Sequence, residues 1–168
     1  MKTVFFVLVA AVVLIPVSTA TAQLPYVEVT FDDYGRINSS YCPPSPVFDE
    51  LSIFAVNFNM WMAAIEYMVD YSVALSYLGD IMVEPGALAI GNSPTGIAIS
   101  YPNVGNAWGP FRTQKVSVWW NCSDCAGFEN TRVVVLPHPL SGKVRAVQWP
   151  SLSAVDAIGM TSTICPYG

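Results

Sequence analysis

The chain has 168 residues, of which 53% are hydrophobic and 11% charged, and its formal net charge is -5 at pH 7. This length suits one domain of about 150 residues, and so apolar a composition excludes intrinsic disorder. Seven basic residues against twelve acidic ones, without a basic run, also exclude nucleic acid as a partner, because binding to a phosphate backbone depends on positive charge.

The N-terminal residues have the three parts of a secretory signal peptide. A charged start is followed by an apolar segment over 4–15 and by small residues that end at Ala22. A membrane anchor is the alternative, but Pro16 interrupts the segment before it reaches the roughly 20 apolar residues that a span needs. We therefore expect residues 1–22 to be removed. The mature chain, 23–168, would be secreted, or periplasmic in a bacterium, with no stable membrane anchor.

The mature chain alternates short β-forming segments with clusters rich in Pro, Gly and Asn, which are typical of turns. A helix over 58–78 is the competing interpretation, but its many β-branched and aromatic residues favour strands. We expect strands over 27–31, 51–58, 64–71, 76–83, 96–101, 114–120, 131–136, 143–149 and 158–165. The pattern predicts a single all-β domain, an antiparallel two-sheet β-sandwich of jelly-roll or immunoglobulin-like type. Residues 34–50 would form an irregular N-terminal arm.

Four cysteines in an exported chain indicate two disulfides, for which three connectivities exist. We expect Cys122–Cys125, because the two lie close in sequence, and Cys42–Cys165. A redox-active Cys-x-x-Cys is the functional alternative, but that motif normally opens a helix, whereas this pair follows a predicted strand. A zinc site that includes His138 lacks a second close pair of ligands.

One stretch of the chain resembles the cohesin family of β-sandwich domains. In 64–72 an aromatic, an aliphatic and a tyrosine alternate at Tyr67, Val69 and Tyr71, and leucines follow before Gly86. The similarity covers about 51–120 and includes a later strand-like segment. It departs at one place, where Ser72 stands in a position that is commonly aspartate. The resemblance implies a secreted jelly-roll-type sandwich that binds a partner or is built into an assembly, and it transfers no binding residue.

The tryptophans are the clearest candidates for a binding surface. Trp119 and Trp120 are consecutive on a predicted strand, so their side chains must lie on opposite faces, and at most one of them can be in the core. Trp108 and Trp149 lie near strand ends, as does Trp61. Core and edge packing is the simplest role for such residues, while an exposed set would suit a sugar ring or a protein partner.

No catalytic residue is expected. The residue types of a Ser-His-Asp catalytic triad occur at His138, Ser141 and Asp156, but no serine lies in a Gly-x-Ser-x-Gly elbow. Glu66 and Asp70 share a strand face, where they would keep that face hydrated rather than act as paired glycosidase carboxylates.

No cofactor or metal is expected either. Asp32-Asp33 and Asp49-Glu50 offer the oxygen ligands that calcium prefers, which makes calcium the alternative, but neither pair belongs to a loop with regularly spaced ligands.

These features together predict a secreted, non-catalytic β-sandwich module for recognition, adhesion or structural assembly in an envelope or extracellular complex. A surface with so little charge has to be covered by loops, glycans or neighbours, so we expect a protein partner or self-association. The alternatives are a carbohydrate-binding module that uses its exposed tryptophans and a self-assembling filament or coat subunit, since apolar strand edges can pair.

Overall fold

A computed structural model describes residues 23–106 and 108–166, and this part of the chain is built from strands without any helix. The expected signal peptide, 1–22, lies outside the described residues. No helix long and apolar enough to span a membrane occurs in the described residues. The strands are β1 (Tyr26–Thr30), β2 (Ser39–Ser40), β3 (Phe48–Val56), β4 (Trp61–Asp70), β5 (Leu75–Ile81), β6 (Leu88–Asn92), β7 (Gly96–Asn106), β8 (Phe111–Trp120), β9 (Thr131–Leu136), β10 (Val144–Trp149), β11 (Ala154–Gly159) and β12 (Thr161–Ile164).

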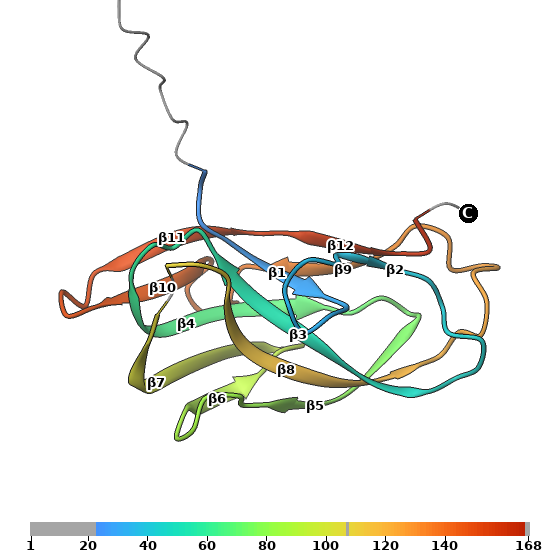
Figure 1. Cartoon of the computed structure of the whole chain (residues 1–168), viewed down its shortest axis with the longest axis horizontal. Helices are drawn as coiled ribbons and strands as arrows, with labels where there is room; N and C mark the ends of the chain where they lie inside the picture. The colour runs from blue at the N-terminus through green and yellow to red at the C-terminus, as the bar shows by residue number, and fades with distance from the viewer. Residues whose placement is uncertain (1–22, 107, 167–168) are drawn as a thin grey trace, which may run out of the picture.

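The strands form a jelly-roll β-sandwich, which confirms the predicted fold class. One sheet has the order β5-β8-β3-β1-β11, and the other contains β6-β7-β4, with β10 and β9 both paired to β4. β11 also pairs with β10, so the two sheets are continuous at that side. Most pairs are antiparallel, but β1–β11 and β2–β12 are parallel, so the sheet is mixed. In Figure 1 the strands run mainly along the long axis, and β5 and β6 lie together along one side.

Most strands occur where the sequence predicts them, and 58–78 forms β4 and the start of β5 rather than a helix. The sequence interpretation misses β6, because all but the last of its five residues are exposed and its Gly91-Asn92 end resembles a turn. It also misses most of β11, since the strand expected over 158–165 includes only its last two residues. The arm over 34–50 is not irregular throughout, since it contains β2 and its last three residues begin β3.

Gly159 is the point where the C-terminal strand passes from one sheet to the other. β11 pairs with β10 and β1, and after this residue the chain continues as β12, which pairs with β9 and β2. A Cβ built at Gly159 would collide with the backbone carbonyl of Val135 on β9. Only glycine permits so close an approach of two backbones.

The core lies between the sheets and is filled by alternate residues of each strand. On β4 the buried side chains of Ile65, Tyr67 and Val69 alternate with less buried neighbours, as a period of two requires. Tyr67 is fully buried, and its hydroxyl lies 2.9 Å from the Thr113 hydroxyl of β8, which gives this polar atom a partner. Other fully buried members of the core are Val27, Val29, Leu51, Ile53, Ile97, Ile99, Val116 and Val118.

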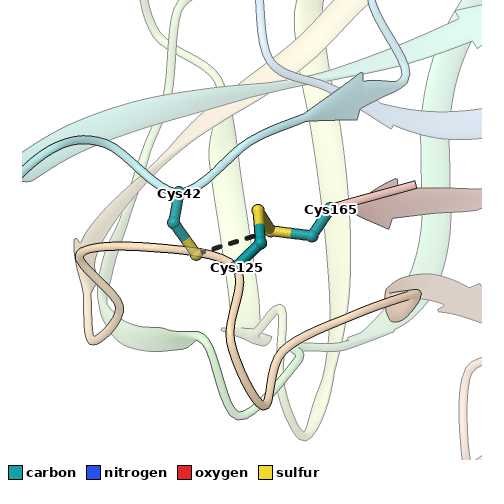
Figure 2. Close-up of side chains that lie close together, drawn as sticks. All are labelled: Cys42, Cys125 and Cys165. Carbon is teal, nitrogen blue, oxygen red and sulfur yellow. Dashed lines mark hydrogen bonds between the residues drawn. A yellow bond between two sulfur atoms is a disulfide. The ribbon is translucent and has the colours of Figure 1, made fainter. Parts of the chain in front are cut away.

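The structure contains two disulfides, but the predicted connectivity, Cys122–Cys125 and Cys42–Cys165, is wrong. The bonds are Cys42–Cys122 and Cys125–Cys165. Cys122 follows the end of β8 against the segment between β2 and β3, whereas the next loop carries Cys125 to the end of β12. All four cysteines still gather in one place: the Cys42 and Cys165 sulfurs, in different bonds, are 3.7 Å apart (Figure 2). Proximity in sequence therefore predicts the wrong disulfide, because the loop after β8 directs Cys122 and Cys125 toward different segments.

Candidate functional site

The outer face of the sheet β10-β4-β7-β6 carries two rows of side chains that are set by the strand register. We call these ten residues the open face. One row crosses from β11 to β6 through Asp156, Arg145, Glu66, Ala98 and Ile90. The second row runs beside it through Ala154, Val147, Ala64, Ser100 and Leu88. Each residue stands opposite its neighbour in the row, so the ten side chains share one face of the sheet.

The open face is a trough with a floor of small side chains. Ala64, Ala98 and Ser100 occupy its middle, where β4 and β7 run side by side. The floor is flanked by Ile90, which is 80% exposed, and by Leu140, which is 92% exposed. Two adjoining hollows, of about 260 and 440 Å³, share Glu66 and Ala98 in their linings and together form one depression. Small residues between exposed apolar ones leave room for the side chains of another molecule.

The charges at the trough are unevenly paired. Arg145 Nε lies 3.1 Å from Asp156 Oδ1, and Lys143 also pairs with this aspartate. Hydrogen bonds from Lys143 and then Arg145 lower the pKa of the Asp156 carboxyl. Glu66 lies opposite Arg145 in the register, yet no ion pair or hydrogen bond of its carboxylate occurs within the described part of the chain. The trough therefore offers a carboxylate without a cation of its own.

Two tryptophans extend the same face toward one end of the sheet. Trp61 of β4 and Trp149 of β10 are direct register partners, and their side chains are 45% and 48% exposed. Trp108 is also exposed. Of the tryptophans predicted as a binding surface, Trp149 therefore lies beside Trp61, next to the open face.

The other predicted pair lies on the opposite sheet. Trp119 and Trp120 lie on opposite faces of β8, as expected from consecutive strand residues, and the exposed member is Trp119. Trp120 is only 2% exposed, and its Nε1 donates to Asp49 Oδ2 at 3.2 Å. The structure thus places Trp120 in the core and leaves Trp119 as the surface candidate of this pair, a choice that the sequence left open. Trp119 stands opposite the exposed Phe48 of β3, away from the open face.

A polar cluster around Asp80 holds the β6–β7 hairpin against β5. The Asp80 carboxylate accepts hydrogen bonds from the Ser93 backbone N–H at 2.9 Å and the Ser93 hydroxyl at 2.6 Å. It also accepts from the Tyr77 hydroxyl at 2.8 Å and from Gln114 Nε2 at 3.2 Å. Because Ser93 belongs to the turn after β6, this one carboxylate fixes the hairpin that forms a wall of the trough.

His138, Ser141 and Asp156 do not assemble a catalytic triad. The buried His138 accepts a hydrogen bond from the Leu140 backbone N–H at Nδ1, and Asp156 is engaged by two basic side chains. The Ser141 hydroxyl donates to the backbone carbonyl of Lys143.

The two acidic pairs considered for calcium lie around one hollow of about 380 Å³. Lys115 Nζ lies 3.0 Å from Asp33 and 3.1 Å from Glu50, and its hydrogen bond is the largest cause of a lowered pKa at Asp33. Asp49 accepts from the indole of Trp120, and Asp32 accepts from the backbone N–H groups of two residues in its own turn. Protein donors and cations thus face these carboxylates, and we assign no metal to them.

The sequence could have identified the outward positions on β4, because Ala64 and Glu66 alternate with the core residues Ile65 and Tyr67. Nothing in it gives the register that sets them beside residues of β7 and β10.

Comparison with solved structures finds cohesin modules that share this fold. The cohesin of a Clostridium perfringens family 33 glycoside hydrolase matches with a TM-score of 0.59 at 9% identity, over 84% of this chain and 95% of that one. A non-cellulosomal cohesin from Archaeoglobus fulgidus matches with a TM-score of 0.52 at 8% identity, over 84% of this chain and 91% of that one. The sixth cohesin of Acetivibrio cellulolyticus scaffoldin B was solved in complex with a mutant Cel5 dockerin. It matches with a TM-score of 0.53 at 14% identity, over 84% of this chain and 98% of that one.

No family model and no curated protein matches the chain. The structural matches show that it has the cohesin-like jelly-roll fold that its sequence resembles.

Proposed function

We propose that this protein is a non-catalytic interaction module that receives a partner protein on its open face. The observation that carries the proposal is the trough itself, a floor of Ala64, Ala98 and Ser100 between exposed apolar side chains. Exposed apolar surface with a few polar groups is typical of protein-binding sites. The proposal is supported by solved structures of the same fold that hold a bound protein, since the Acetivibrio cellulolyticus cohesin is in complex with a dockerin, as is the OlpA cohesin of Clostridium thermocellum.

The chemistry of the trough defines what the partner must present. Apolar side chains would fill the depression over Ala64 and Ala98, where the hydrophobic effect favours contact. A Lys or Arg of the partner would meet the carboxylate of Glu66, whose register neighbour Arg145 is already engaged by Asp156. An acidic chain with a net charge of -5 also attracts a basic partner over a longer range.

The test is binding of two purified dockerins, the Cel5 dockerin of Acetivibrio cellulolyticus and Doc918 of Clostridium thermocellum, measured by calorimetry on the whole protein. We expect saturable binding of at least one. Ala98→Arg, which fills the centre of the floor, should weaken it by about 30-fold or more, equivalent to a loss of about 2 kcal/mol. Leu78→Lys is the matched control, because Leu78 is an exposed residue of β5 on the other sheet.

A second variant tests whether the negative charge of Glu66 contributes to binding. Glu66→Gln keeps the shape of the side chain but removes its charge. It should weaken binding mainly at low salt, because salt screens the attraction between the Glu66 carboxylate and a basic group of the partner. Absence of binding to both dockerins would argue against a dockerin-type partner. Binding that Ala98→Arg leaves unchanged would argue against the open face.

We also propose that the protein acts outside the cytoplasm. The N-terminal sequence pattern and the two disulfides support export, because disulfides persist in oxidising compartments. N-terminal sequencing of the protein recovered from a secreting host should begin at Gln23. An intact N-terminus on cell-associated protein with free thiols would contradict export.

A glycan is the second candidate, favoured by one observation. Trp61 and Trp149 are register partners with exposed side chains on one face, an arrangement on which a sugar ring can stack. Trp149→Ala should abolish retention on a polysaccharide array, whereas Trp119→Ala, which removes a comparably exposed tryptophan from the other sheet, should not. Equal behaviour of both variants, or no retention of the parent, would remove this candidate.

A further inference from the structure

Among the described residues, three strands have an edge that no other strand covers, namely β2, β5 and β6. An uncovered edge presents free backbone N–H and C=O groups and is a template for another strand. Natural proteins protect such edges by making them very short, by introducing bulges or by placing charges on them. The three edges of this protein differ in whether they carry such protection.

Two of the edges are protected. β2 has only two residues, which is too short to template a further strand. β5 has a register shift between Tyr77 and Gly79, and it carries the charged Asp80. These features interrupt the regular ladder that a second strand would need.

β6 is neither very short nor charged, and Gly91 is its one position with a left-handed backbone conformation. Its five residues pair with β7 in an unbroken register, and no charged residue occurs anywhere in 86–102. Leu88 and Ile90 are 70% and 80% exposed, so two large apolar side chains stand at the rim of the sheet.

The backbone of β6 is oriented for pairing. The Val69 N–H donates to the Ser93 carbonyl, so Val69 and, by alternation, Tyr67 direct their peptide groups toward the β7 side of β4. The register then directs the peptide groups of Ala98 toward β6 and those of its partner Ile90 toward β7, so those of Ala89 face outward. The outward side therefore offers a donor and an acceptor at Ala89.

We propose that β6 pairs with β6 of a second copy of this chain, antiparallel and edge to edge, to form a dimer with one continuous sheet. An uncharged strand meets its own copy without like-charge repulsion, whereas nothing on it would select a charged foreign peptide. A two-fold axis at Ile90 sets this residue against its equivalent and Leu88 against Asn92, so each exposed leucine and isoleucine gains a neighbour.

This pairing extends the sheet that carries the open face. A two-fold axis normal to a continuous sheet keeps the outer faces of both copies on the same side. The dimer would therefore present two troughs side by side, and two linked partner modules would bind it with avidity. The pairing of β6 does not itself depend on the proposed function.

The experiment is sedimentation velocity of the whole protein over a wide range of concentrations. We expect a reversible monomer–dimer equilibrium. Ile90→Lys places a charge on the edge, and Ala89→Pro removes its outward N–H; each should raise the dimer Kd by about tenfold or more. Leu78→Lys on the protected β5 edge is the matched control and should dimerise like the parent.

Two further measurements distinguish a loss of dimerisation from a loss of the folded structure. Urea unfolding of each variant separates loss of pairing from loss of the fold. Hydrogen exchange of the Ala89 N–H in the parent, which needs no variant, should slow as the protein concentration rises. A parent that stays monomeric at every concentration would overturn the proposal, and so would a dimer that Ile90→Lys and Ala89→Pro leave unchanged.

Discussion

Asp80 gives the sharpest prediction for the fold, because one carboxylate joins three segments of the chain. It accepts hydrogen bonds from Tyr77 on its own strand, from Ser93 after β6 and from Gln114 on β8. Ser93 and Gln114 are both 0% exposed, so water cannot replace the carboxylate without a rearrangement. Asp80→Ala should therefore destabilise the protein and loosen the β6–β7 hairpin in particular.

The magnitude follows from the groups that lose their acceptor. The Ser93 backbone N–H and the Gln114 amide become unsatisfied, and each buried unsatisfied group costs about 1–3 kcal/mol. The Ser93 hydroxyl keeps the Tyr71 hydroxyl at 2.8 Å, and the Tyr77 hydroxyl can turn to solvent. We expect a loss of about 3 kcal/mol in the free energy of unfolding, which lowers the melting temperature by about 6–12 °C for a domain of this size.

The assay is urea unfolding of the parent and of Asp80→Ala, with hydrogen exchange as the local readout. Asp80→Asn keeps the shape and one acceptor oxygen, so its loss should be about half as large. Asp156→Ala removes a carboxylate that lies at the surface, where ion pairs contribute little, and should change the unfolding midpoint far less. An Asp80→Ala variant with the parental midpoint and unchanged exchange in β6 would show that this carboxylate does not hold the hairpin.

Three further predictions concern the rest of the fold. Peptide mapping without reduction should find the pairs Cys42–Cys122 and Cys125–Cys165; any other pairing would contradict the structure. Gly159→Ala should destabilise the protein by about 1–3 kcal/mol in thermal unfolding, since its Cβ would meet a backbone carbonyl of β9, whereas Gly109→Ala, with open space around it, should not. Burial, and then the hydrogen bond to Asp80, raises the pKa of Tyr77 from 10.0 to about 12. The neutral phenol is thus favoured in the folded state, so its contribution is complete below pH 10 and is lost as the pH rises from there to about 12. Urea midpoints measured across this range should fall, and a flat profile would contradict the assignment.

The sequence predicts those features that depend on period-two patterns. Tyr67 and Val69 alternate with outward residues because one face of β4 is buried, and this places both the core and the strand in the sequence without a structure. Trp119 and Trp120 show the limit of this reasoning: alternation puts them on opposite faces but does not say which face is the core.

Other features depend on contacts between distant segments, and local patterns do not encode these. β6 is exposed on both faces, so it lacks the alternation by which a half-buried strand is recognised. The disulfide pairs depend on where the loop after β8 ends, and proximity in sequence misidentifies them. The open face requires the register of β4 against β7 and β10, which brings Glu66 beside Ala98 and Arg145.

A hydrogen-exchange and cross-saturation footprint of the protein with a bound dockerin would locate the partner on one of the two sheets. If the open face binds the partner, protection and saturation transfer will occur on β4, β7 and β10, centred on Ala64 and Ala98, with no change on β3 and β8 around Trp119. A footprint on the β3–β8 sheet, with the open face unaffected, would contradict binding at the open face.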